Sequence, residues 1–94
     1  MNGIELIANE RSEQIDKHGR TIEYDFYQNK NGQLAIGAIM LLVVDFEEWI
    51  DSASYPHGWN EDVCEKMIAK NYKERLSIAG ALIAAELDRI AFKP

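Results

Sequence analysis

The sequence predicts an all-α fold, a small bundle of three longer helices and one short helix in a single domain over residues 1–94. Apolar residues recur at three- and four-residue spacing along most of the chain, and no segment alternates apolar and polar residues as a half-buried strand does. Residues that commonly begin or end helices flank the periodic segments. A chain of this length holds one small core that stabilises a monomer only modestly, so we expect a homo-oligomer.

The first helix is predicted over residues 2–17, where the apolar positions form one stripe. Asn2 is suited to cap the first turn, and Gly19 is a residue type that ends a helix in the left-handed conformation. A charged residue, Arg11, lies near the middle of the stripe. The stripe comprises Ile4, Ile7, Ala8, Arg11, Ile15 and His18.

Residues 19–31 show neither helical periodicity nor alternation, yet they are too apolar for a solvated linker. We predict that this segment is a packed loop. A second, longer helix is predicted over residues 32–53, with Asn29 or Asn31 as its cap. Because its first half is apolar on nearly every side, this helix should be the central one.

Residues 54–60 contain Pro56 and Gly58, which interrupt the helical pattern. Asn60 is expected to cap a short, peripheral helix that ends near residue 71. The last helix is predicted from Tyr72 or Glu74 to Phe92. Its small residues permit close approach of a neighbouring helix, and they are Ala79, Gly80, Ala81, Ala84 and Ala85.

Composition and charge exclude several classes of partner and location. Ten Lys and Arg residues stand against sixteen Asp and Glu residues, for a net charge of -6, and a field of that sign repels nucleic acid. The lone Cys64 cannot close an intrachain disulfide, which favours a cytoplasmic location. The longest uncharged apolar run, residues 34–44, is shorter than the roughly 20 residues of a membrane span, so no membrane partner is expected.

Arg11 and Asp45 are charged residues at positions where the helical pattern predicts burial. An unpaired guanidinium there would carry a severe desolvation cost, so Arg11 needs an anion. One interpretation is an internal ion pair with Asp45, Asp25 or Glu86 that fixes how the helices dock, unless the side chain extends outward to water. The other is bidentate binding of a substrate phosphate by the planar guanidinium.

Other candidate site residues border the apolar faces of the predicted helices. Glu10 lies beside the stripe of the first helix, and Glu86 lies beside that of the last. Carboxylates that converge from different helices of a bundle hold Mg²⁺, whereas the alternative is a solvated acidic face. Trp59 belongs to an aromatic group around the Pro56 turn, where such a ring either stacks on a nucleobase or fills a small core.

Six segments of the chain resemble motifs of a group of small phage and prophage proteins. That group begins with E-R-x-x-Q-I, continues with G-E-L-A-x-A-A and an aromatic Pro/Trp loop, and closes on a pattern that contains A-G-A-L-I-x-A-E-x-x-R. The similar segments here are ERSEQI (10–15), HG (18–19), EYD (23–25), GQLAIGA (32–38), YPHGW (55–59) and residues 75–89. The closing motif is the most specific of them.

This group is loosely related to MazG-like all-α nucleoside triphosphate pyrophosphohydrolases, including dATP/dGTP pyrophosphohydrolases. The resemblance implies a helical oligomer in which carboxylates of neighbouring helices bind Mg²⁺, water attacks the α-phosphate of a nucleotide, and pyrophosphate leaves. The chain departs from the pattern, because Gln33 stands where the group usually has Glu and no E-x-x-E is followed by E-x-x-D. The resemblance therefore implies either a rebuilt site or a non-enzymatic interaction or nucleotide-binding module that has lost the metal site.

The enzymatic alternative assigns roles to six residues. A nucleoside triphosphate would be the substrate and Mg²⁺ the cofactor. The expected metal ligands are Glu10, Asp25 and Glu86. The expected substrate contacts are Arg11 and Trp59, and Asp45 is a structural partner of Arg11 or of a ligand.

Overall fold

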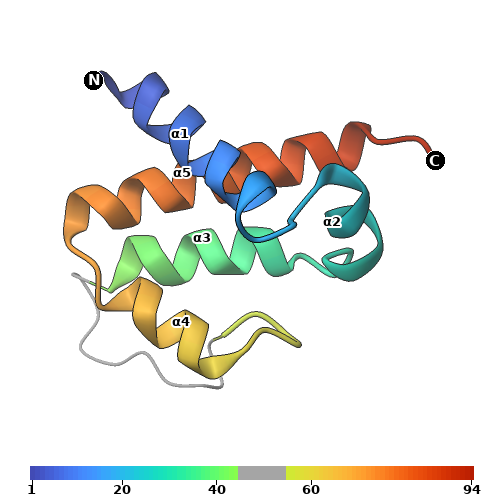
Figure 1. Ribbon diagram of the computed structural model, residues 1–94. Coiled ribbons are helices and arrows are strands. Elements are labelled where there is room, and N and C mark those ends of the chain that lie inside the picture. Colours follow the sequence, from blue (N-terminus) through green and yellow to red (C-terminus); the bar gives the residue numbers. More distant parts are fainter. Residues whose placement is uncertain (45–54) are drawn as a thin grey trace.

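The computed structural model describes residues 1–44 and 55–94 (Figure 1). Every element of regular structure in these two ranges is a helix, so the predicted all-α class is confirmed. Five helices lie in the described ranges, one more than predicted. In chain order they are α1 (Gly3–Asp16), α2 (Ile22–Gln28), α3 (Gln33–Val43), α4 (Glu61–Ile68) and α5 (Tyr72–Ala91).

Helix α1 begins and ends close to where the sequence predicted. The Asn2 side chain accepts a hydrogen bond from the backbone N–H of Glu5 at 2.9 Å, and the Glu5 carboxylate accepts one from the N–H of Asn2 at 3.2 Å. This reciprocal pair is a capping box, which satisfies two donors at the start of the helix. At the other end, Gly19 adopts a positive φ of 64°, so the prediction for the helix terminus is also confirmed.

The predicted loop over residues 19–31 is wrong, because most of it folds as α2. Thr21 caps this helix, and its hydroxyl accepts a hydrogen bond from the N–H of Tyr24 at 3.1 Å. The residues that α2 buries are polar, since Asp25 lies within the helix and Asn29 is its C-cap. A two-turn helix with a polar buried face leaves no apolar periodicity in the sequence.

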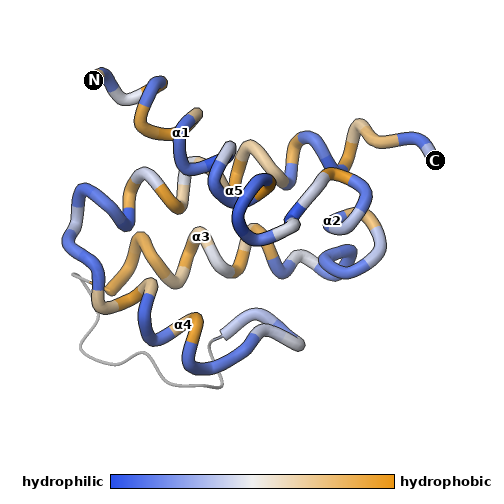
Figure 2. Tube along the Cα trace, in the orientation of Figure 1, coloured by the Kyte–Doolittle hydropathy of each residue, from blue (hydrophilic) through white to orange (hydrophobic). Residues whose placement is uncertain are grey.

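Helix α3 is strongly apolar, as predicted (Figure 2). The central helix is α5 instead, because α1, α2 and α3 all pack against it. Helix α3 buries Leu34, Ala38, Met40 and Leu41. Its cap is Gly32, which has a φ of 80°, and not Asn29 or Asn31 as expected. Residues 45–53 of the helix predicted over 32–53 lie outside the described ranges.

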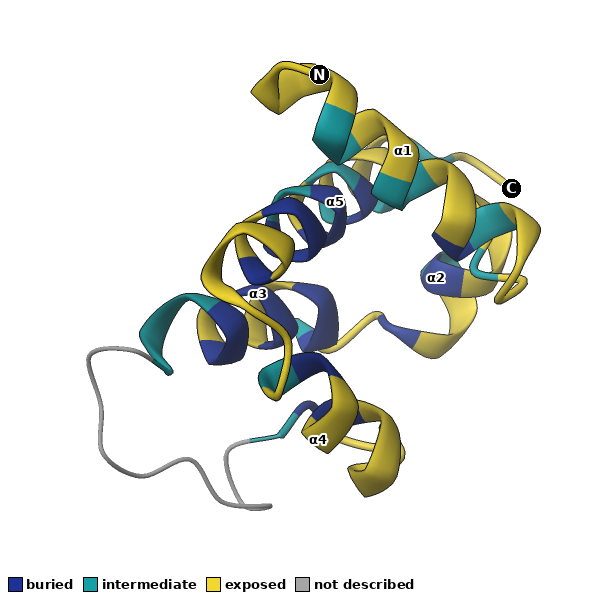
Figure 3. Cartoon of the chain, turned by 60° about the vertical axis from the view of Figure 1, so that its left-hand side comes forward, coloured by how far each residue is buried: buried dark blue, intermediate teal, exposed yellow. Residues whose placement is uncertain are grey.

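Helices α4 and α5 confirm the short and the long helix predicted for the end of the chain. Asn60 caps α4 and Asn71 caps α5, each through a side-chain oxygen that accepts a backbone N–H. Figure 3 shows the buried faces of α3 and α5 turned toward each other, and α1 and α2 also pack on α5. Among the described residues, no helix combines the length and apolar character that crossing a membrane requires.

Two glycines allow close packing against α3 and α5. A Cβ at Gly37 of α3 would lie 2.8 Å from Cη2 of Trp59, and a Cβ at Gly80 of α5 would lie 2.5 Å from Cδ1 of Ile7. The close approach of a neighbouring helix at Gly80 agrees with the small-residue face predicted for α5. Helix α1 therefore crosses α5 at this glycine.

Candidate functional site

The candidate site is a group of buried and partly buried charged and amide side chains together with the exposed Asp88, which we call the polar cluster. Its members come from α1, α2 and α5, and the loop residue Trp59 contacts it. The sequence predicts helices for the first and last of these three segments and a loop for the middle one. The cluster comprises Arg11, Asp25, Asn29, Glu86 and Asp88.

Asp25 is the centre of the polar cluster and has 0% exposure. Its Oδ1 accepts a hydrogen bond from Nδ2 of Asn29 at 2.8 Å. The Asn29 Oδ1 in turn accepts one from Nε1 of Trp59 at 2.8 Å. The other oxygen, Asp25 Oδ2, is buried without a hydrogen-bond partner among the described residues. One half of this carboxyl group is thus held by the fold, and the other half is available to a further group.

Arg11 lies beside that unpaired oxygen, with a side chain that is only 11% exposed. Its Nη1 donates a hydrogen bond to the carbonyl oxygen of Arg20 at 3.2 Å. Its Nη2 lies 3.9 Å from Asp25 Oδ2 and 3.6 Å from Asp88 Oδ2. Both distances exceed hydrogen-bond length, and Nη2 and Nε make no hydrogen bond to any described residue.

Arg11 therefore has an anionic neighbour in Asp25, one of the three acids considered for an internal ion pair. Asp45 lies outside the described residues. Asp88 was not among the acids considered. Because the distances are too long for hydrogen bonds, Arg11 keeps N–H groups that make no hydrogen bond with a described residue and lie near the carboxylates of Asp25 and Asp88.

Glu86 approaches the polar cluster from α5. Its Oε1 accepts a hydrogen bond from Nε of Arg89 at 2.6 Å, and Nη2 of Arg89 completes the ion pair. Its Oε2 is buried and has no hydrogen-bond partner in the described part of the chain. Glu86 is close enough for its charge to raise the pKa of Asp25. Asp25 and Glu86, each with one carboxylate oxygen unpaired among the described residues, thus interact electrostatically between α2 and α5.

Burial raises the pKa of the Asp25 carboxyl above its ordinary value of 3.8, because desolvation penalises the charged form. The hydrogen bond from Asn29 and the charges of Arg11 and Arg20 act in the opposite direction, and the charge of Glu86 adds to the rise. A carboxyl whose pKa is shifted within a charged cluster is found both at functional sites and in structural ion-pair networks.

Glu10 does not belong to the polar cluster. It lines a separate cleft between α1 and α4, where burial and the neighbouring charge of Glu13 raise its pKa. In residues 1–44 and 55–94, no three His, Cys, Asp or Glu side chains are grouped to hold a metal ion. The structure does not bring Glu10 together with Asp25 and Glu86, because Glu10 lines a cleft with residues of α4.

Trp59, the predicted base-stacking residue, is engaged by protein groups. Its ring packs against the core and contacts α3 at Gly37. The guanidinium carbon of Arg20 lies over the ring, 5.1 Å from its centroid, at cation–π distance. With its Nε1 bonded to Asn29, the indole helps to orient the polar cluster, which agrees with the core-filling interpretation.

The cleft that contains Glu10 has a volume of about 400 Å³. We call it the α1–α4 cleft. No sequence motif marks it, because its polar residues come from α1, α4 and the segments that follow these two helices. Its lining is Glu10, Glu13, Gln14, His18, Arg20, Val63, Lys66, Met67, Lys70 and Ile78.

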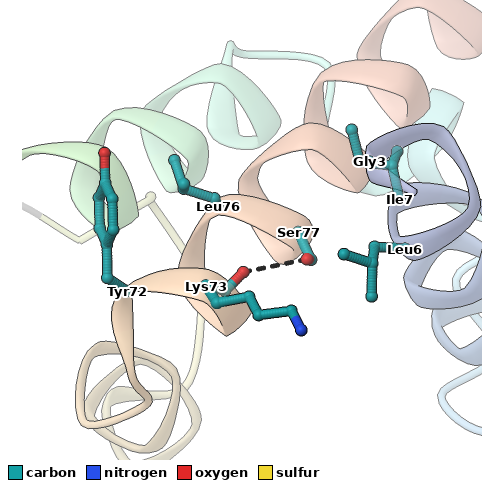
Figure 4. Close-up of a pocket in the computed structure, with 7 residues that line it drawn as sticks. All are labelled: Gly3, Leu6, Ile7, Tyr72, Lys73, Leu76 and Ser77. Carbon is teal, nitrogen blue, oxygen red and sulfur yellow. Dashed lines mark hydrogen bonds between the residues drawn. The ribbon is translucent and has the colours of Figure 1, made fainter. Parts of the chain in front are cut away.

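A second hollow is a smaller apolar groove of about 260 Å³ between the start of α1 and the first half of α5 (Figure 4). Leu6, Ile7 and Leu76 form its walls, and the Ser77 hydroxyl donates a hydrogen bond to the carbonyl of Lys73 at 3.0 Å. Because that hydroxyl is satisfied within its own helix, this groove offers a ligand few polar contacts.

No protein-family model, curated protein or solved structure matches the chain. The MazG-like resemblance therefore stays a prediction, and the case for function depends on the geometry of the polar cluster.

Proposed function

We propose that the chain is a Mg²⁺-dependent nucleoside triphosphate pyrophosphohydrolase-like protein whose site is the polar cluster. One observation carries the proposal. Asp25 Oδ2 and Glu86 Oε2 are buried carboxylate oxygens from two helices, and neither has a hydrogen-bond partner among the described residues. Native folds seldom leave such atoms unpaired, so their presence supports binding of a further group.

The polar cluster offers two carboxylates with a buried oxygen that is unpaired among the described residues, which supports the proposal of a magnesium ion. Mg²⁺ prefers oxygen ligands, keeps several waters and is usually bound through one or two carboxylates plus substrate phosphates. Asp25 and Glu86 would supply those carboxylates, without the Glu10 of the predicted set. When bound, the metal would neutralise phosphate charge and lower the pKa of water.

Arg11 is the residue of the chain that would bind the substrate phosphate. Its Nε and Nη2 groups carry N–H donors that no described residue accepts, while the Arg20 carbonyl holds Nη1 in place. A guanidinium anchored at one nitrogen can present the others to a phosphate oxygen as a fork. The cluster would thus supply two carboxylates to bind Mg²⁺ and one guanidinium to bind the substrate phosphate.

The test is pyrophosphate release from each deoxynucleoside triphosphate in the presence of Mg²⁺. We expect turnover by the native chain and a loss of about 100-fold or more in Asp25→Asn and Glu86→Gln, the scale of removing a group that stabilises transition-state charge. Glu23→Gln, an exposed acid of α2, is the matched control. Absence of turnover at micromolar protein, or full activity of both cluster variants, would contradict the proposal.

A second candidate function is non-enzymatic self-association through α5. Ile83, Leu87 and Ile90 are exposed on this helix at three- and four-residue spacing, which is the pattern of a helix-packing seam. This stripe supports the expected homo-oligomer. Leu87→Glu should lower the molar mass measured by sedimentation, whereas Lys93→Glu, an exposed control at the end of the chain, should leave it unchanged.

A further inference from the structure

A chain of hydrogen bonds connects the aromatic loop with the buried carboxyl group of the polar cluster. Nε1 of Trp59 donates to Oδ1 of Asn29 at 2.8 Å, and Nδ2 of Asn29 donates to Oδ1 of Asp25 at 2.8 Å. The backbone N–H of Asn29 also donates to the carbonyl of Asp25 at 2.9 Å. Asn29 and Asp25 are both buried, and hydrogen bonds in a buried environment are electrostatically stronger than in water.

The indole of Trp59 determines the direction of this chain. A tryptophan ring N–H can only donate, whereas an asparagine amide has an acceptor oxygen and a donor nitrogen. Trp59 therefore requires Oδ1 of Asn29 on its side, which leaves Nδ2 for Asp25. The reverse orientation would place two donors together at Trp59 and two acceptors together at Asp25. Oδ1 of Asp25 is thus occupied by the fold, while Oδ2 has no hydrogen-bond partner among the described residues.

Backbone geometry and packing both hold the indole in place. The backbone N–H of Trp59 donates to the carbonyl of Pro56 at 3.1 Å. This bond closes a turn in which Gly58 has a φ of 81°, a conformation that favours glycine at the third position of the turn. The ring packs where Gly37 has no side chain, and the guanidinium of Arg20 lies over it. The N–H of a ring held in this way points in one direction.

Arg20 also supports the other side of the Arg11–Asp25 pair. Its carbonyl accepts a hydrogen bond from Nη1 of Arg11 at 3.2 Å, and Nη2 of Arg11 lies 3.9 Å from Oδ2 of Asp25. The contacts therefore form a closed ring of five residues. In ring order these residues are Trp59, Asn29, Asp25, Arg11 and Arg20.

We infer that Trp59 and Asn29 are positioning residues, which turn Oδ2 of Asp25 toward Arg11 and keep that oxygen free for a ligand. The identity of the ligand rests on the proposed function, in which Asp25 binds Mg²⁺. Residues that hydrogen-bond to a metal ligand orient it, and their loss typically lowers metal affinity about 10–100-fold. The aromatic loop thus takes part in the site through Asp25, without contacting the metal or the substrate.

The first measurement is the NMR signal of the Trp59 indole N–H in the metal-free full chain. The sequence contains two tryptophans, and nuclear Overhauser contacts of the ring with Gly37 distinguish this one. We expect Asp25→Asn to shift the signal, because a change of charge at one end of a hydrogen-bond chain alters the polarisation of its other bonds. Asn29→Leu should abolish that response. Glu23→Gln, which neutralises an exposed acid of α2, is the matched control and should leave the signal in place.

The second measurement is the Kd for Mg²⁺ by calorimetry. Trp59→Phe keeps an aromatic ring and removes the N–H, and Asn29→Leu keeps the approximate volume and removes the amide. Each should raise the Kd by about tenfold or more. Ile68→Ala is the control for a general loss of packing, because it truncates a core side chain at the far end of α4. It should leave the Kd unchanged.

Two results would overturn the inference. One is an indole signal that does not respond to Asp25→Asn, and the other is native Mg²⁺ affinity in both Trp59→Phe and Asn29→Leu. If those two variants fail to fold, the response to Asp25→Asn still decides, because that substitution keeps the shape of the side chain and leaves the indole native.

Failure of the proposed function gives a different result. A native chain that neither binds Mg²⁺ nor releases pyrophosphate would reject the magnesium-dependent activity, whereas a shifted indole signal in the metal-free Asp25→Asn variant would still support the positioning of Asp25. Pyrophosphate release by a chain whose indole ignores Asp25→Asn would reject the positioning and retain the activity.

Discussion

Nη2 of Arg11 lies 3.9 Å from Oδ2 of Asp25, and neither atom has a hydrogen-bond partner among the described residues. The two residues are 14 positions apart and belong to different helices, so their approach fixes how α2 docks on α1. A buried pair at this separation supplies attraction without the full stabilisation of a close, bidentate contact. The same geometry leaves both residues able to bind a further polar group.

Arg11→Met should destabilise the fold by about 3 kcal/mol at neutral pH, because it leaves the buried Asp25 carboxylate without its cation. The measurement is urea unfolding of the variant and of the native chain. In an Asp25→Asn background the same substitution should cost clearly less, since no buried carboxylate remains to be compensated. Equal costs in the two backgrounds would show that the pair contributes nothing.

The free energy of unfolding of the Asp25→Asn variant should increase relative to that of the native chain as pH rises. Burial raises the pKa of Asp25 above 3.8, so the folded state holds this proton more tightly than the unfolded state. The contribution of Asp25 to stability is therefore complete below its ordinary pKa and is lost as pH rises through the higher folded value. Unfolding free energies measured from acidic to neutral pH should show this trend, and a difference that is constant or reversed would contradict it.

Gly37→Ala should destabilise the protein by about 1–3 kcal/mol, as overpacking of a core does. The new Cβ would lie 2.8 Å from the rigid indole of Trp59. Gly80→Ala is the matched comparison, because its Cβ would meet the flexible end of Ile7, and it should cost less. Thermal unfolding of both variants measures the two losses of stability. A larger loss for Gly80→Ala than for Gly37→Ala would contradict the prediction.

Thr21→Ala should cost about 1 kcal/mol by removing the cap of α2. Because α2 holds Asp25 and Asn29, its fraying should also raise amide hydrogen exchange over residues 22–28. Asn60→Ala, which removes the corresponding cap of α4, should raise exchange over residues 61–68 and leave α2 protected. Unchanged exchange in α2 after Thr21→Ala would show that packing on α5 alone maintains this helix.

Local chemistry was sufficient to predict α1, α4 and α5. Asn2, Asn60 and Asn71 each cap a helix, because a side-chain oxygen beside the first turn acts on neighbours within three residues. Apolar periodicity likewise indicated the buried faces. The sequence also indicated that Arg11 needs an acid, since the cost of burying its charge does not depend on which helix supplies the partner.

Only the tertiary structure decided which side chains meet. Helix α2 escaped prediction because its buried residues, Asp25 and Asn29, are polar, and polar residues are ordinarily read as exposed. Glu10 turns toward α4 rather than Asp25, because helix rotation and crossing are set by packing, such as that of Ile7 on Gly80. The sequence by itself determined α1, α4 and α5 and the need of Arg11 for an anion, whereas contacts between residues distant in the chain depend on how the helices pack in three dimensions.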